Sequence, residues 1–341
     1  MQQFIRCSSI SETFLPLHVN HSQNGMMKNF PIQLKWQILR TRLYLDRLRG
    51  RNFIFPLLVF VLTTTGLLLY YNIFQTSNLW HEWSIASGNA FHFCEANRMD
   101  SLIRQPSNTW SNLGFFLVGL FTLTLGIQDL KYSERKESDN FLVRYPIFSI
   151  MFGLSAIYVF IGSFFYHASL TSFFQKMDQA GMYSLIIMVI TFNIYKIFPL
   201  IRIKGEWRSS HALLVAFAMG MNYLILTTMV KFNINVLFPA LVIVAFLTSV
   251  YYLLFVSREH YFTKYLWASF VILVLSAIIW ILDRTNSVCS PESIFQGHAL
   301  WHIMNAASIL FIYMYYRSGV VPIQKTLEWR EERRKRRRGE L

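Results

Sequence analysis

Eight stretches of the sequence carry no charged side chain and are long enough to cross a lipid bilayer. A membrane-spanning helix needs about 20 mostly apolar residues. The windows are Phe53–Phe74, Asn108–Gln128, Tyr145–Gln175, Gln179–Tyr195, Ser209–Val230, Phe232–Ser257, Tyr265–Leu282 and Ser293–Tyr316. Each is expected to be helical, because lipid cannot satisfy the backbone of an open strand. Only 15% of the residues are charged, against about 25% in soluble domains. These features predict an all-α integral membrane protein with eight spans.

Basic residues predict how the spans are oriented. The chain has 32 Lys and Arg against 18 Asp and Glu, a net charge of +14. With both termini in the cytoplasm, 27 of those 32 basic residues face the cytoplasm. The five on the other side are Arg98, Arg104, Lys176, Lys231 and Arg284. This bias follows the positive-inside rule. We therefore expect two basic cytoplasmic tails, residues 1–52 and 319–341, which suit anionic lipid headgroups.

The basic tails do not predict a nucleic-acid partner. Aromatic residues do not interleave with the C-terminal basic run, and no recognition motif accompanies it. The first window, residues 53–74, is longer than the 7–15 residue apolar core of a signal peptide. We interpret it as a retained membrane helix, followed by a polar and aromatic segment, residues 75–107, outside the cytoplasm.

Five polar side chains within the predicted spans are expected to meet at one depth. Ser163 and His167 share one helix face near the outer end of the third span. Asp178 opens the fourth span, and His298 and His302 share one face at the start of the last. In the predicted orientation all five lie near the non-cytoplasmic surface, and intramembrane ionisable groups are functional candidates.

Three histidines with an open fourth position form a common catalytic zinc arrangement, in which a nearby carboxylate or hydroxyl orients the bound water. We therefore predict zinc at His167, His298 and His302. Two alternatives stay open. Each histidine could instead make a hydrogen bond between packed helices. A haem with two axial histidines would leave Ser163 and Asp178 without roles.

Two of the three cysteines lie on the non-cytoplasmic side in this topology. Cys94 precedes the second span, and Cys289 precedes the last. Cysteines that face an oxidising compartment tend to pair, so we predict a Cys94–Cys289 disulfide. The alternative is two free, buried thiols. Cys7 lies alone in the cytoplasmic tail.

Five short motifs, in this order, resemble the alkaline ceramidase family and the wider superfamily of intramembrane hydrolases that includes the adiponectin-receptor-like proteins. The family pattern is C-E-x-N, then S-N-L, then G-S-x-x-x-H, an Asp eleven residues later, and finally H-x-x-W-H. The matching residues are Cys94 to Asn97, Ser111 to Leu113, Gly162 to His167, Asp178, and His298 to His302. Trp280 and Asp283 fit a further W-x-x-D motif.

The resemblance covers about residues 92–318 and implies a seven-helix core, residues 75–318. The window 53–74 would then be an extra N-terminal helix. In the family the three histidines bind zinc, and the Ser and Asp correspond to Ser163 and Asp178. Some members also bind calcium, through positions equivalent to His92, Phe93, Glu95, Asn97 and Gln105. Here His92 and Gln105 replace acidic residues, and Ca²⁺ prefers charged oxygens, so we expect no tight calcium site.

The resemblance thus implies a zinc-dependent hydrolase that releases a fatty acid from ceramide-like sphingolipids. Asp178 would act as general base and then deliver the proton to the leaving amine. Ser163 would donate a hydrogen bond to the oxyanion. Trp301, between the two histidines, would line the substrate pocket or else anchor the helix at the membrane interface. The alternative function is a non-catalytic lipid receptor of the same superfamily. The sequence does not specify an oligomeric state.

Overall fold

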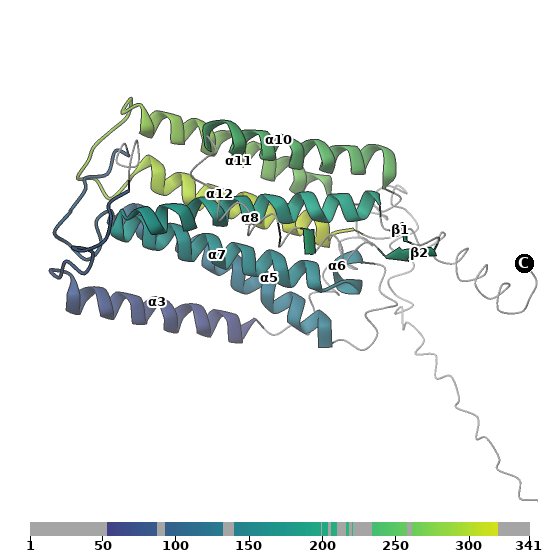
Figure 1. Cartoon of the computed structure of the whole chain (residues 1–341), viewed down its shortest axis with the longest axis horizontal. Helices are drawn as coiled ribbons and strands as arrows, with labels where there is room; N and C mark the ends of the chain where they lie inside the picture. Colours follow the sequence, from purple (N-terminus) through teal and green to yellow (C-terminus); the bar gives the residue numbers. More distant parts are fainter. Residues whose placement is uncertain are drawn as a thin grey trace, which may run out of the picture. The chain divides into compact units, whose positions relative to one another are not determined.

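The computed structural model describes residues 53–86, 93–131, 140–198, 200–203, 206–209, 216–217, 220, 234–257 and 261–319. Within this part of the chain, helices dominate (Figure 1). The helices are α3 (Ile54–Phe74), α4 (Pro106–Ser111), α5 (Leu113–Lys131), α6 (Phe141–Arg144), α7 (Ile147–Ser169), α8 (Ser172–Ile197), α10 (Ile234–Tyr251) with the π-helical turn η4 (Tyr252–Val256), α11 (Thr263–Arg284) and α12 (Gly297–Arg317). The strands are β1 (Leu200–Ile203) and β2 (Glu206–Ser209).

Six helical segments in the described residues are long and apolar enough to span a membrane. They are Ile54–Phe74, Pro106–Lys131, Ile147–Ser169, Ser172–Ile197, Val236–Val256 and Thr263–Arg284. The chain is therefore an integral, multi-pass membrane protein. The expectation of eight spans is met for these six. The predicted last span forms α12, whose polar side chains keep it outside this set, and the predicted span Ser209–Val230 lies mostly outside the described residues.

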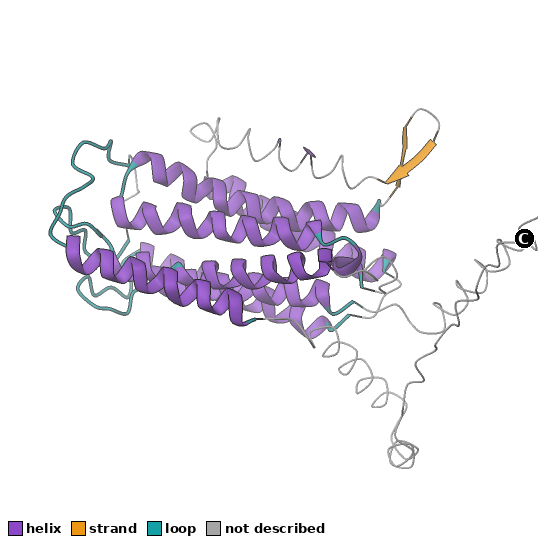
Figure 2. Ribbon diagram, turned by 90° about the horizontal axis from the view of Figure 1, so that it is seen from below, coloured by secondary structure: helices purple, strands orange, loops and turns teal. Residues whose placement is uncertain are grey.

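The all-α expectation is met by the described bundle, to which the short strands β1 and β2 are an addition. They form a two-stranded antiparallel hairpin in which Leu200 pairs with Ser209 and Ile203 pairs with Glu206 (Figure 2). The hairpin is short, and the rest of the described bundle remains helical.

Glycine allows α7 and α8 to pack closely. A Cβ atom at Gly162 would lie 2.6 Å from the Met177 backbone, and one at Gly181 would lie 2.8 Å from Cα of Val159. Small residues let helix backbones approach each other in membranes, where the surrounding lipid is as apolar as the side chains. The two helices are therefore held in a fixed register, with Gly162 opposite the backbone of Met177 and Asp178.

The ends of α5 and α12 are joined by a buried ion pair. The guanidinium Nη1 of Arg317 lies 2.7 Å from Oδ2 of Asp129, and both side chains are fully buried. The Asn140 side chain donates to the backbone carbonyls of Arg317 and Gly319. Arg317 lies nineteen residues after His298 on α12, which is about 28 Å along a helix axis. The ion pair and the histidines therefore lie near opposite ends of this helix.

The N-terminal helix α3 exposes most of its side chains. Its partly buried contacts are with α5, where Phe53 stacks on Phe121 and Phe60 contacts Phe116. Figure 1 shows α3 at one side of the bundle, next to α5. Its exposed leucine, isoleucine and phenylalanine side chains suit contact with lipid.

Candidate metal centre

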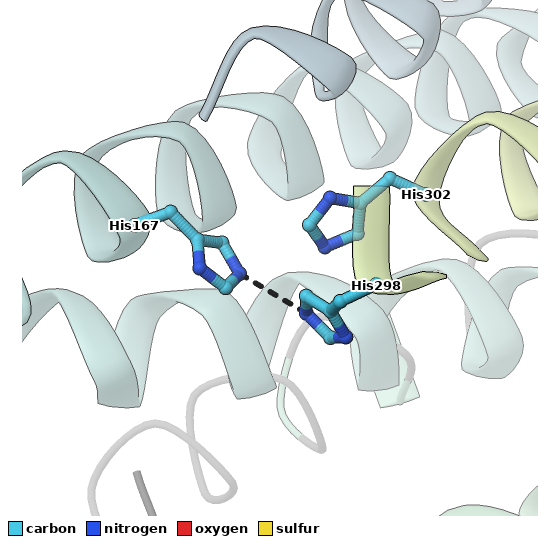
Figure 3. Close-up of side chains that lie close together, drawn as sticks. All are labelled: His167, His298 and His302. Atoms are coloured by element: carbon cyan, nitrogen blue, oxygen red, sulfur yellow. Dashed lines mark hydrogen bonds between the residues drawn. The ribbon is translucent and has the colours of Figure 1, made fainter. Parts of the chain in front are cut away.

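Three buried histidines from two helices converge at one end of the bundle. His167 lies in the last turn of α7, and His298 and His302 lie in the first two turns of α12. A ligand atom from each lies within 4.8 Å of the other two. Figure 3 shows the three rings facing one another. The prediction that membrane depth brings these residues together is met, although 131 residues separate His167 from His298.

Polar partners fix the ring nitrogens of two of these histidines. Nδ1 of His167 lies 2.7 Å from Oε1 of Gln105, and Nδ1 of His302 lies 2.8 Å from Oγ of Ser111. The single hydroxyl hydrogen of Ser111 goes to the carbonyl of Asn108, so Ser111 accepts from His302. The amide oxygen of Gln105 likewise accepts from His167. Both rings therefore carry hydrogen on Nδ1 and present a lone pair on Nε2.

His298 is held by stacking and by its backbone. Its ring stacks on Phe93 at 3.8 Å and on Trp301 at 5.2 Å between ring centroids. Its backbone N–H donates to Oδ1 of Asp283. Its Nδ1 atom is buried and has no hydrogen-bond partner among the described residues. The ring is thus firmly placed while one of its nitrogens has no protein partner.

The spacing of the His167 and His298 ring nitrogens fits a zinc ion. Nε2 of His298 lies 3.2 Å from Nε2 of His167. Zn–N bonds of about 2.0–2.1 Å in a tetrahedral site place two ligand nitrogens about 3.3–3.4 Å apart. Neutral imidazoles with a second ring nitrogen bound to an oxygen acceptor are the usual form of zinc-ligating histidines. The donor set is therefore compatible with the predicted metal.

Ser163 and Asp178 meet beside this cluster. The close approach of Gly162 to the α8 backbone lets the Ser163 side chain hydrogen-bond the Asp178 carboxylate. Ser163 is buried and Asp178 is only partly buried. The Asp178 oxygens are not among the ligand atoms that lie within 4.8 Å of one another. The carboxylate therefore belongs to the surroundings of the histidines rather than to the ligand set itself.

A disulfide ties the segment before α4 to the segment before α12. Cys94 and Cys289 are bonded, with their Cα atoms 5.4 Å apart, which confirms the predicted pairing. The Asp283 carboxylate adds a second tie, since Oδ2 accepts the backbone N–H of Cys94 while Oδ1 accepts that of His298. The buried end of α11 therefore joins the outer segment to the helix that carries two of the histidines.

Side chains considered as calcium ligands are used within the protein. The two carboxylate oxygens of Glu95 accept the backbone N–H groups of Ser107 and Asn108, so Glu95 caps the N-terminus of α4. Burial raises the pKa of the Glu95 carboxyl, although these two hydrogen bonds oppose the shift. The Gln105 amide nitrogen donates to Oδ1 of Asn97. His92 lies outside the described residues.

Comparison with known families agrees with this geometry. The family model described as Ceramidase matches residues 87–332. The chain belongs to the ceramidase family. No match was found among curated proteins. The matched range contains the three histidines, Ser163, Asp178 and both bonded cysteines, and it leaves out α3.

An apolar cavity of about 130 Å³ adjoins the metal centre of this ceramidase-family protein. Residues from α5, α7, α8, α10, α11 and α12 line it. Trp301 and Phe115 border both the cavity and the histidines, since Trp301 stacks on His298 and Phe115 lies edge-on to His302. A hydrocarbon chain in this cavity would therefore end beside the metal ligands.

Sequence reasoning missed three residues that position the ligands. Ser111 and Gln105 orient two imidazoles, and Asp283 holds the start of α12. Ser111 and Asp283 did lie in the motifs that carried the family resemblance, so the motifs were a usable signal. Gln105 had been considered only as a weakened calcium ligand, whereas the structure places its amide oxygen on His167.

Proposed function

We propose that this protein is a zinc-dependent intramembrane amide hydrolase that releases a fatty acid from ceramide-like sphingolipids. The observation that carries the proposal is the buried cluster of His167, His298 and His302 in a chain of the ceramidase family. Two of the three rings are fixed in the tautomer that presents Nε2 to a metal ion. A cluster of neutral imidazoles, without thiolates, suits a catalytic zinc site.

Zinc bound here would polarise the substrate carbonyl and lower the pKa of an attacking water to about 7. Asp178 is the residue proposed to take the proton from that water and then give it to the leaving amine. Asp178 is only partly buried, and its carboxylate accepts a hydrogen bond from Ser163, which lies one helical turn before His167 on α7. The Ser163 hydroxyl, hydrogen-bonded to Asp178, orients this carboxylate in the resting protein.

Ser163 is also proposed to donate to the carbonyl oxygen as negative charge develops on it. Because the hydroxyl has one hydrogen, this role requires Ser163 to turn from Asp178 to the substrate. Such a change is compatible with a carboxylate that has just gained a proton and accepts hydrogen bonds less strongly. The proposed sequence therefore couples proton uptake by Asp178 to stabilisation of the oxyanion by Ser163.

The substrate proposal rests on the cavity. Its lining is almost entirely apolar, and Trp301 separates it from the ring of His298. A lipid amide whose hydrocarbon chain fills the cavity would place its polar end at the histidines. A membrane-embedded site can receive such a substrate laterally from the bilayer. We propose ceramide-like lipids as the class, with Trp301 as the pocket residue nearest the reacting amide.

We further propose that both termini are cytoplasmic and that the metal centre lies near the outer or luminal side. The charge distribution supports this orientation, as does a disulfide at the same end as the histidines. The basic tails would then contact anionic headgroups of the cytoplasmic leaflet. Tags at the two ends should become accessible from the same side of sealed vesicles. Labelling from opposite sides would contradict an even number of spans.

The decisive experiment measures fatty-acid release from labelled ceramide by purified protein. We expect release to stop after removal of metal with a chelator and to return with added zinc. Replacing both His298 and His302 by Ala should abolish bound zinc and hydrolysis together. His81→Ala is the matched control, because His81 is exposed and outside the cluster. Zinc binding without hydrolysis of any ceramide would favour a lipid receptor instead.

A further inference from the structure

The apolar cavity contains one amide side chain, Asn305, that the mechanism above does not use. Asn305 lies on α12, is only 8% exposed, and lines the cavity together with Phe115, Trp301 and Ile309. A polar group this deeply buried normally has its hydrogen-bonding atoms satisfied by the protein or by an ordered molecule. The partners of its two polar atoms therefore indicate what the cavity is built to hold.

Hydrogen bonding fixes the orientation of this amide. Nδ2 of Asn305 donates to the backbone carbonyl of Trp301 at 2.7 Å and to Oγ of Ser276 at 3.3 Å. A backbone carbonyl can only accept, and the Ser276 hydroxyl hydrogen already goes to the carbonyl of Leu273. Both hydrogens of the amide nitrogen are therefore used, and the flipped orientation would lose both bonds.

The amide oxygen is left available. No described residue donates a hydrogen bond to Oδ1 of Asn305. Other polar side chains of the cavity use their hydrogens within the protein. Ser308 donates to the carbonyl of Ser269, Ser269 can then donate to Ser308, and Ser249 donates to the carbonyl of Ala245. Asn305 thus brings an amide oxygen that has no donor among the described residues to the lining of the cavity.

Asn305 lies on the same face of α12 as the metal ligands. It follows His298 by seven residues and His302 by three, and both spacings keep side chains on one side of a helix. Three residues correspond to about 4.5 Å along the helix axis. A substrate with its amide at the histidines would therefore pass Asn305 within the first few carbons of one of its chains.

We propose that Oδ1 of Asn305 accepts a hydrogen bond from a hydroxyl group carried close to the amide on the lipid substrate, and so selects for that hydroxyl. The inference rests on the proposed hydrolase function and adds to it a residue that determines specificity. Ceramide-like lipids carry such hydroxyls on the long-chain base, and some carry one on the acyl chain. An all-hydrocarbon occupant would leave the buried acceptor unsatisfied, which is unfavourable.

Matched lipid pairs test this. Each pair differs by one hydroxyl: at carbon 3 or carbon 4 of the base, or at carbon 2 of the acyl chain. We expect the wild type to favour the hydroxylated member of one pair by about two- to tenfold in kcat/KM, the range of one net hydrogen bond. Asn305→Leu, similar in size but without an acceptor, should bring that ratio close to one. The pair that responds identifies the chain that passes Asn305.

Ser308→Ala is the matched control, because Ser308 lines the same cavity but gives its hydrogen to Ser269. Its ratios should follow those of the wild type. Displacement of a fluorescent ceramide by each lipid gives a binding ratio that does not depend on turnover. The proposal would be overturned if, for every lipid pair, the wild type and Asn305→Leu showed the same preference for the hydroxylated lipid, whether measured by hydrolysis or by binding. Binding selectivity that depends on Asn305 without hydrolysis would instead contradict the hydrolase function alone.

Discussion

Removing the hydroxyl of Ser111 tests whether the outer partners of the histidines control the metal. Ser111 contacts His302 through a 2.8 Å hydrogen bond to Nδ1, and the other hydrogen bond of its hydroxyl goes to the Asn108 carbonyl rather than to the cluster. In Ser111→Ala the ring keeps its place on α12 and the backbone of Asn108 as a partner, but it loses its side-chain acceptor. The imidazole can then carry hydrogen on Nε2, which removes the lone pair needed for the metal.

The size of the effect can be estimated in two ways. Loss of an acceptor for a metal-ligating histidine lowers metal affinity by about 10- to 100-fold, which is about 1.4–2.7 kcal/mol. A buried N–H left without a partner costs about 1–3 kcal/mol. The two ranges agree because the same hydrogen bond is lost in both descriptions. We therefore expect zinc affinity to fall by one to two orders of magnitude, with zinc still bound when it is in excess.

Competition with a chromophoric zinc chelator, in the same detergent or nanodisc for every variant, measures the change. Thr122→Val is the matched control, because Thr122 is buried on the same transmembrane segment and bonds only to carbonyls of its own helix. Gln105→Leu should lower affinity by a similar factor through His167. Zinc affinity of Ser111→Ala within about twofold of the wild type would refute the proposed control of the metal by Ser111, since the bond would then contribute almost nothing.

Three further outcomes are expected. Cys94→Ser or reduction should lower thermal stability and hydrolysis, whereas Cys7→Ser should change neither. A 195-residue separation gives about 5 kcal/mol as an upper value, and unchanged melting would argue against a stabilising role of the disulfide. Millimolar Ca²⁺ should alter the rate of hydrolysis by less than about twofold, because Glu95 already caps α4 and few charged oxygens remain to bind the ion. Strong activation by Ca²⁺ that is lost in Glu95→Ala would instead show a calcium site. Arg317→Met should destabilise the protein by about 3–5 kcal/mol, because it removes the guanidinium that faces the buried Asp129 carboxylate. Asp129→Leu in the same chain should recover much of the loss, and equal melting of the single and double variants would contradict this.

The meeting of the histidines could be predicted because a bilayer fixes where helices begin and end. Once the spans alternate, His167 at the end of α7 and His298 at the start of α12 must lie at one depth, whatever their sequence separation. The six candidate spans of the structure each overlap a predicted window. Depth alone, however, leaves the rotation of each helix about its own axis undetermined.

Helix rotation is why the partners of the histidines escaped prediction. Ser111 and His302 are 191 residues apart, and Gln105 and His167 are 62 apart. A helix that is apolar on all sides carries no amphipathic stripe to show which face is inward. The directions in which the Ser111 and Asp283 side chains point therefore depend on helix packing, which hydropathy does not describe. The hairpin of β1 and β2 was missed for another reason, because strands of four residues give too short an alternation to recognise.

The outer segment supplies the positional information that an apolar bundle lacks. Between helices in lipid there is little hydrophobic driving force, so relative positions depend on close packing and polar contacts. The segment makes such contacts with α4 and with α7, and it is linked to the start of α12 through Asp283. Glu95 caps α4 and so holds the start of the span that continues as α5, Gln105 holds His167 on α7, and the backbone of Cys94 shares the Asp283 carboxylate with the start of α12. A shift of any one helix would break a buried polar contact that the membrane could not replace. The spacing of the three imidazoles therefore depends on residues of segment 75–107 and on Asp283, which are not part of the histidine cluster.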